Sequence, residues 1–121
     1  METSHLQLPK ATMAMLLLQK RQSTNRIRIE EVSENLLTLK QKNIPIGDLN
    51  FSIGASGYHC EQLAAFIGSL VLAGDAKTDS PIQLTEHGIA RCQKIIKSAL
   101  AKDPSTANMI AHEINFNLST L

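Results

Sequence analysis

The chain has 121 residues, 43% of them hydrophobic and 19% charged, and its formal net charge is +1. This size and composition are typical of one globular domain with its own core and exclude a disordered or fibrous protein. The longest apolar run, residues 13–18, is too short to cross a bilayer, and the two cysteines lack a CxxC spacing. We therefore expect a cytoplasmic protein with two buried thiols and no membrane span.

Basic residues are distributed unevenly along the chain. Residues 1–43 contain seven lysines and arginines, whereas none occurs from residue 43 to residue 76, where acidic residues prevail. Aromatic residues make up only 3% of the chain, which argues against a stacking platform for single-stranded nucleic acid.

The first predicted element is a helix over residues 10–20, with Pro9 in its first turn. Its side chains are apolar on nearly every side. Such a helix is buried, either centrally in the domain or between two subunits.

A short strand and a second helix follow. Arg26 and Arg28 alternate with isoleucines, so both arginines project from the same face of a strand over residues 26–29. Glu30 and Glu31 then begin a second helix, because carboxylates are favoured at the positive N-terminal end of a helix. This helix ends near Asn43.

Residues 44–58 are predicted to be irregular, with one extended piece at 50–53. A third helix follows over residues 59–73, and Gly74 stands where a left-handed C-terminal cap is needed. Two short strands, 76–77 and 82–84, form a hairpin.

Thr85 is expected to cap a fourth helix that ends near Lys102, and Asp103-Pro104 begins a last short one. We divide the chain into a domain over residues 1–103 and a C-terminal helical extension over 104–121. The periodicity predicts a buried spine, which consists of Leu16, Leu17, Leu36, Leu63, Phe66, Ile67, Leu70 and Leu84.

The second half of the chain resembles the winged-helix superfamily. The similarity lies in Leu70-x-x-Ala73-Gly74-Asp75-Ala76, a short turn, and Ile82-x-Leu84-Thr85-x-x-Gly88. These residues look like the recognition helix, wing and exit helix of MarR-type and PadR-type regulators and of some phage-associated winged-helix proteins. The resemblance covers residues 60–100 and implies a mainly α fold with a small β-hairpin, a winged helix-turn-helix. It also implies a DNA-binding transcriptional regulator.

The resemblance places the third helix in the major groove of double-stranded DNA and the wing on the backbone. On that basis we expect Gln62 to contact a base edge and His59 to contact a phosphate. Arg26, Arg28 and Lys77 are expected to bind phosphates.

The absence of basic residues in the third helix departs from this pattern. It leaves open a second hypothesis, a winged-helix interaction module that binds a protein partner through an acidic face of the third helix and does not touch DNA.

Other chemistry has little support. His59-Cys60 and His87 with Cys92 match no zinc spacing, and Gly54-Ala55-Ser56-Gly57 lacks the basic residue of an RNA-clamping GxxG loop. Ser56 is not in a GxSxG motif. We predict no enzyme activity, no catalytic residue, no metal and no cofactor.

The two ends of the chain are richer in apolar residues than a winged-helix core requires. Besides the first helix, Met109, Ile110, Ile114 and Phe116 lie beyond the core motif. We therefore expect a homodimer held by its terminal helices. The alternative is that the tail folds back over its own first helix.

Overall fold

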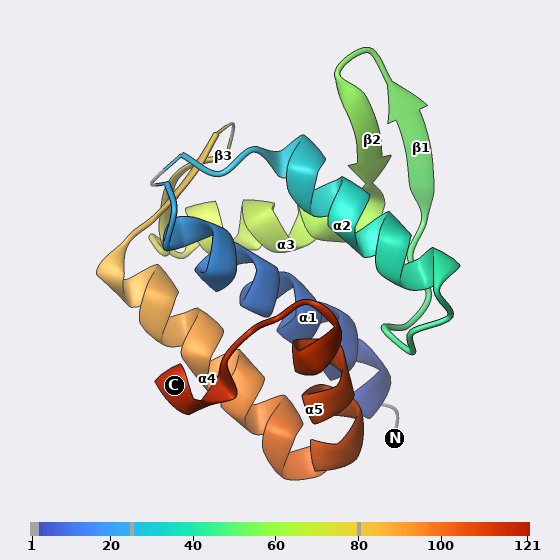
Figure 1. Cartoon of the computed structure of the whole chain (residues 1–121). Helices are drawn as coiled ribbons and strands as arrows, with labels where there is room; N and C mark the ends of the chain where they lie inside the picture. The colour runs from blue at the N-terminus through green and yellow to red at the C-terminus, as the bar shows by residue number, and fades with distance from the viewer. Residues whose placement is uncertain (1–2, 25, 80) are drawn as a thin grey trace.

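The computed structural model describes residues 3–24, 26–79 and 81–121 (Figure 1). In this part of the chain the protein is mainly helical, with two small antiparallel hairpins, which confirms the predicted α+β class. The elements in chain order are α1 Thr3–Arg21, α2 Ile29–Gln41, β1 Phe51–Gly54, β2 Gly57–Cys60, α3 Glu61–Leu72, β3 Ala76–Asp79, β4 Ile82–Leu84, α4 Glu86–Lys102 and α5 Pro104–Glu113, followed by a 3-10 turn at Leu118–Thr120.

Helix α1 is the centre of the molecule. Residues 11–17 are all buried, and Figure 1 shows the helix with α2 and α3 on one side and α4 and α5 on the other. The polar Thr12 is tolerated there because its hydroxyl donates a hydrogen bond to the Leu8 carbonyl at 2.8 Å. The helix is therefore buried within one chain, the first of the two alternatives.

The predicted start of α1 was wrong. The helix begins at Thr3, so Pro9 lies inside it rather than in its first turn. A proline removes one backbone hydrogen bond, to the carbonyl four residues before it. In α1 the missing hydrogen bond lies within the first two turns, so few backbone hydrogen bonds of the helix come before it.

The predicted strand over residues 26–29 is reduced to a single bridge. Ile27 pairs with Ile82 through two hydrogen bonds of 3.0 and 2.8 Å, and Ile29 is already the first residue of α2. Both paired isoleucines are buried. The bridge attaches the segment before α2 to the edge of the β3–β4 hairpin.

The hairpin of β1 and β2 was not predicted. Phe51 pairs with Cys60 and Gly54 with Gly57, so His59 and Cys60 belong to a strand and not to the third helix. Gly57 has φ +129°, a conformation that favours glycine after the turn. Because most of the four-residue strands are exposed on both faces, they show no alternation of apolar and polar residues.

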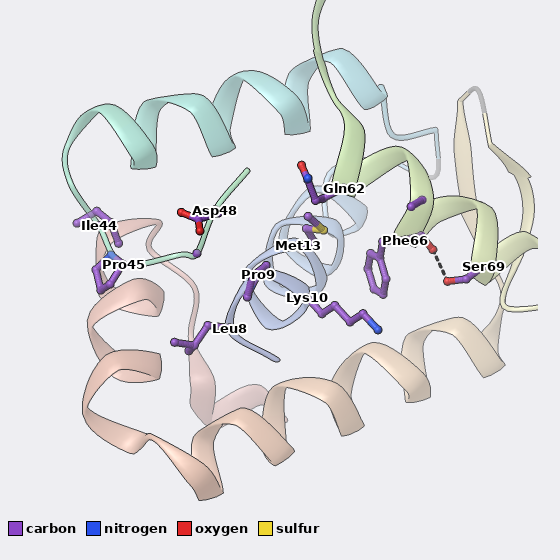
Figure 2. A pocket seen from close by; sticks show the side chains of 12 residues that line it. Leu8, Pro9, Lys10, Met13, Ile44, Pro45, Asp48, Gln62, Phe66 and Ser69 are labelled. Carbon is purple, nitrogen blue, oxygen red and sulfur yellow. Dashed lines mark hydrogen bonds between the residues drawn. The ribbon is translucent and has the colours of Figure 1, made fainter. Parts of the chain in front are cut away.

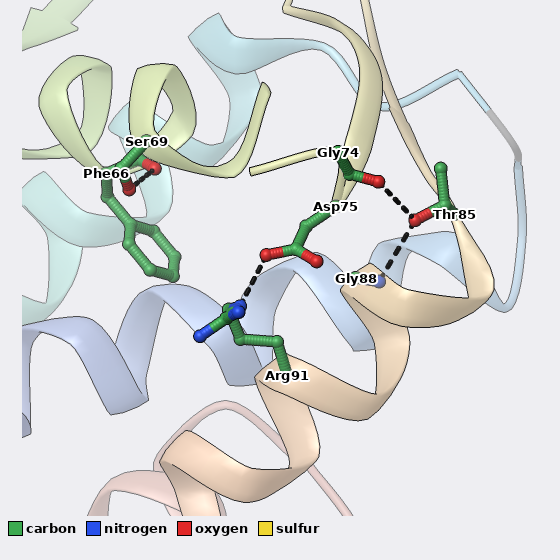
Figure 3. A network of polar contacts seen from close by, with 7 residues as sticks. All are labelled: Phe66, Ser69, Gly74, Asp75, Thr85, Gly88 and Arg91. Carbon is green, nitrogen blue, oxygen red and sulfur yellow. Dashed lines mark hydrogen bonds and ion pairs between the residues drawn. The ribbon is translucent and has the colours of Figure 1, made fainter. Parts of the chain in front are cut away.

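The junction between α3 and α4 matches the prediction closely. Gly74 has φ +80°, and the Asp75 N–H donates to the Leu70 carbonyl at 2.8 Å to close α3. The Thr85 hydroxyl accepts from the Gly88 N–H at 3.1 Å and donates to the Gly74 carbonyl at 3.0 Å (Figure 3). One side chain thus caps α4 and ties it to the end of α3.

Seven of the eight predicted spine residues are buried. The exception, Leu84, is half-buried on β4, where it pairs with Ala76. The core also takes in Ile110 and Phe116 of the C-terminal extension, which folds back on α1. No helix in the described ranges combines the length and apolar character needed to cross a membrane.

We predict opposite effects of alanine at two helical glycines. A Cβ at Gly88 would lie 1.9 Å from the Asp75 carbonyl oxygen, whereas a Cβ at Gly68 of α3 would meet nothing within 4 Å. Gly88→Ala should therefore lower the free energy of unfolding by about 3 kcal/mol, and Gly68→Ala should raise it by up to about 1 kcal/mol. Urea denaturation of both variants measures this difference, and equal effects would contradict the close packing at Gly88.

Candidate functional site

The first candidate site is the outward side of the β3–β4 hairpin, the predicted wing, with the attached Ile27 segment. Alternation along each strand turns Ile27, Ala76 and Ile82 into the core. Their neighbours therefore face outward, and they are exposed: Arg26, Arg28 and Lys77. We call these three residues the wing face.

The two glutamates at the start of α2 interact with residues outside the wing face and do not neutralise its three cations. Glu31 lies 4.0 Å from the Lys20 ammonium, and the Glu30 carboxylate accepts a hydrogen bond from Ser56 in the other hairpin at 3.3 Å. Within the described part of the chain, no ion pair involves a residue of the wing face. These three positive groups suit an anionic partner such as a phosphate backbone.

His59 and Gln62 lie at the start of α3, whereas the wing leaves its end (Figure 1). Only the turn of the β1–β2 hairpin approaches the wing face, because Ser56 donates a hydrogen bond to Glu30, two residues beyond Arg28. His59 is exposed on β2, opposite Ser52. The structure therefore gathers three of the five predicted DNA contacts and leaves two at the far end of α3.

Gln62 has a structural role. Its amide oxygen accepts the Asn50 N–H at 2.8 Å and lies 3.8 Å from the Cys60 sulfur. These bonds fasten the start of β1 to the first turn of α3. A bidentate contact between glutamine and adenine uses the same amide oxygen. Gln62 can therefore make this contact only if its hydrogen bond with the Asn50 N–H breaks.

The exposed side of α3 offers hydrophobic contact rather than hydrogen bonds. Leu72 is 90% exposed, and Ala64 and Ala65 are exposed beside it. The Ser69 hydroxyl already donates to the Phe66 carbonyl at 2.7 Å. The predicted acidic face is also absent, because Glu61 is the only charged residue of α3.

A second candidate site is a groove along α3 that borders this exposed side at Ala65 and Ser69, and we call it the α3 groove. One part has a volume of about 1110 Å³ and lies between α1, α3 and the loop before β1 (Figure 2). A second part of about 590 Å³ continues between α3 and α4, and the two share Lys10, Phe66 and Ser69. Sequence patterns did not indicate the groove, because its walls come from four separate segments of the chain.

The second part also contains an ion pair between a buried carboxylate and an exposed guanidinium. Asp75 is 3% exposed, and its carboxylate accepts a hydrogen bond from the guanidinium of Arg91, which reaches it from α4 (Figure 3). A buried carboxylate needs such a partner. The pair joins α4 to the end of α3, next to the capped junction, and is primarily structural.

Both cysteines are buried and free, as predicted. Burial raises the pKa of the Cys60 thiol, and burial together with the nearby Asp75 carboxylate raises the pKa of Cys92 to about 12. Such thiols are poor nucleophiles at neutral pH. The described residues also contain no group of three or more His, Cys, Asp or Glu side chains that would hold a metal ion.

The Cys92 thiol predicts a loss of stability at high pH. Its ordinary pKa is 9.0, so above pH 9 the unfolded chain loses this proton while the folded chain keeps it up to about pH 12. The unfolded state then binds fewer protons, and the free energy of unfolding falls with rising pH, by about 1.4 kcal/mol per unit for this group.

The control is Cys92→Ala, followed by urea denaturation between pH 8 and pH 10.5. Its free energy of unfolding should fall less steeply than that of the unchanged protein over the upper part of this range. Parallel pH profiles would show that Cys92 ionises normally in the folded state.

Comparisons of the chain with protein-family models, with curated proteins and with solved structures find no match. Function is therefore inferred from the wing face and the α3 groove.

Proposed function

We propose that the protein is a winged-helix DNA-binding regulator that contacts the phosphate backbone of double-stranded DNA through its wing face. The order of elements supports this proposal: helix, extended segment, helix, helix, hairpin, helix, with the extended segment paired to the second strand of the hairpin. This is the order of a winged helix, with the β1–β2 hairpin inserted before its third helix.

The observation that carries the proposal is the bridge between Ile27 and Ile82. It attaches Arg26 and Arg28 to the wing that bears Lys77, and so converts dispersed charges into one cationic surface. Each phosphate that such a surface neutralises releases counterions, which makes the affinity depend on salt.

Sequence discrimination is expected to be weak. The exposed side of α3 presents alanines and Leu72 where a DNA-reading helix presents arginine, lysine, asparagine or glutamine. Phosphate contacts orient a protein on DNA without identifying bases. The affinity is therefore carried by the wing face, with a minor contribution from Gln62 and His59.

Salt dependence tests this proposal. With three phosphate contacts, the logarithm of the association constant for a random duplex should fall with the logarithm of salt concentration with a slope of about −2.7 per chain. Arg28→Ala should weaken binding to all duplexes alike and flatten the slope by about one unit. Fluorescence anisotropy at 20–200 mM salt measures both quantities.

Lys97→Ala is the matched control, because Lys97 is an exposed base on α4 away from the wing. It should leave the slope unchanged. No binding to duplex DNA at 20 mM salt, or an equal effect of the two substitutions, would refute the proposed interface.

We further propose that the DNA-bound form is a homodimer, because two wings on neighbouring half-sites double the number of phosphate contacts. The apolar residues of α1 and the tail do not provide the dimer interface, since α5 covers α1 within one chain. The apolar surface that α5 still offers includes Met109, which is 43% exposed.

Sedimentation velocity at micromolar concentration tests the dimer. The intact protein should sediment as a dimer, and Met109→Glu should shift it toward the monomer without lowering the melting temperature, because this side chain is partly exposed. A monomeric intact protein, alone and on DNA, would rule out the dimer.

The second candidate function is an interaction module that binds a protein through the exposed side of α3. It is favoured by the exposure of Leu72 and by the lack of charge along the rest of that helix. This function predicts no affinity for random duplex at low salt, so the same titration separates it from DNA binding.

A further inference from the structure

We propose that the α3 groove binds an acidic, amphipathic α-helix of a partner protein. The groove goes beyond the proposed contact with DNA, because none of the residues that line it belongs to the wing face. Leu72, the most exposed apolar residue of α3, does not line the groove, although the two surfaces adjoin at Ala65.

The shape of the groove fits a helix. Five residues of α3 and its C-cap residue line it at spacings of three and four, so they form one side of the helix along nearly its whole length: Gln62, Ala65, Phe66, Ser69, Leu70 and Ala73. A trough about 17 Å long accommodates about three helical turns. Ala65, Ser69 and Ala73 form a row of small side chains four residues apart, against which a ridge of a second helix packs closely.

The floor of the groove is apolar. Met13 and Phe66 are buried beneath it, and Leu8, Ile44 and Ile95 are half-buried along its edges. Figure 2 shows the Phe66 ring directed from α3 toward α1, with Leu8 and Ile44 on the opposite side. Such a surface accepts a stripe of apolar side chains at helical spacing, as in other helix-in-groove complexes.

The charges of the groove select an acidic partner. Lys10 and Lys94 are exposed on the α1 and α4 walls, and Lys10 extends alongside Phe66 in Figure 2. Arg91 is neutralised by its pair with the buried Asp75, and the one other acid among the described lining residues, Asp48, lies at the opposite end in the loop before β1. The α4 end therefore carries two cations, which favour acidic side chains on the bound helix.

The dimensions argue against a small molecule as the occupant. The first part alone, about 1110 Å³, exceeds the roughly 1,000 Å³ upper limit of usual small-molecule sites, and it continues into the second part along α3. The two lysines lie at the exposed rim, where they suit the edge of a helix better than the polar head of an enclosed ligand.

A display library of 16-residue peptides, with apolar and charged positions randomised, tests this inference on the full chain. Selected peptides should have apolar residues at i, i+3 or i+4, and i+7, and a negative net charge. Fluorescence anisotropy with the best peptide should show at least about tenfold weaker binding for Lys10→Glu and for Lys94→Glu. Ala65→Arg, at an exposed position of the groove wall, should abolish binding.

Lys97→Glu is the charge-matched control, and it should bind the peptide normally. Circular dichroism and melting curves establish that each variant is folded, and Ser69→Arg repeats the test should Ala65→Arg unfold the protein. The Arg26, Arg28 and Lys77 alanine variants should bind the peptide unchanged, so this inference and DNA binding fail separately.

Three results would overturn the inference. They are no enrichment of any peptide, selection of basic or non-helical peptides, and peptide binding that survives both arginine substitutions in folded protein. Binding of dodecanoate in the groove, with no competing helix, would assign the site to a small amphiphile instead.

Discussion

The burial of α1 is the constraint on which the rest of the structure depends. A helix that is apolar on every side is stable only when other elements cover all of it. Here α2 and α3 cover one side, and α4 and α5 cover the other. The C-terminal extension is therefore a part of the core that closes the last open side of α1, because Ile110 and Phe116 lie in the same cluster as residues 13–17.

This arrangement fixes the positions of both candidate sites. Helix α3 packs Leu63, Phe66, Ile67 and Leu70 into the core and cannot rotate without exposing them. The junction at Gly74, Asp75, Thr85 and Gly88 then sets where the wing leaves α3 and where α4 begins. The α3 groove is the space that remains between α3, the start of α1 and α4.

The two surfaces of the protein separate charge from apolar contact. The wing face presents cations with little apolar area, whereas the α3 groove presents the apolar Met13 and Phe66, with Lys10 and Lys94 at its rim. Phosphate binding and helix docking make opposite demands on a surface, the first for unpaired positive charge and the second for desolvated apolar area. The two proposals therefore assign DNA and a protein partner to separate surfaces, so neither partner would displace the other.

The sequence by itself determined the order of the five helices and the junction, but not the residues at which α1 and α3 begin. Helical periodicity placed seven of eight core residues, and the caps at Gly74, Thr85 and Asp103 were visible because capping depends on residues within one turn of each other. The junction motif was likewise local, and both buried thiols followed from composition.

Only the tertiary structure decided the β1–β2 hairpin, the Ile27–Ile82 bridge and the α3 groove. The hairpin strands are too short and too exposed to carry a pattern, and the bridge joins residues that lie 55 positions apart in the chain. The position of His59 on a strand, and the use of the Gln62 oxygen by Asn50, depended on that hairpin. The groove required four segments to meet, and the side of α1 on which the tail packs was set by long-range burial, which no local pattern encodes.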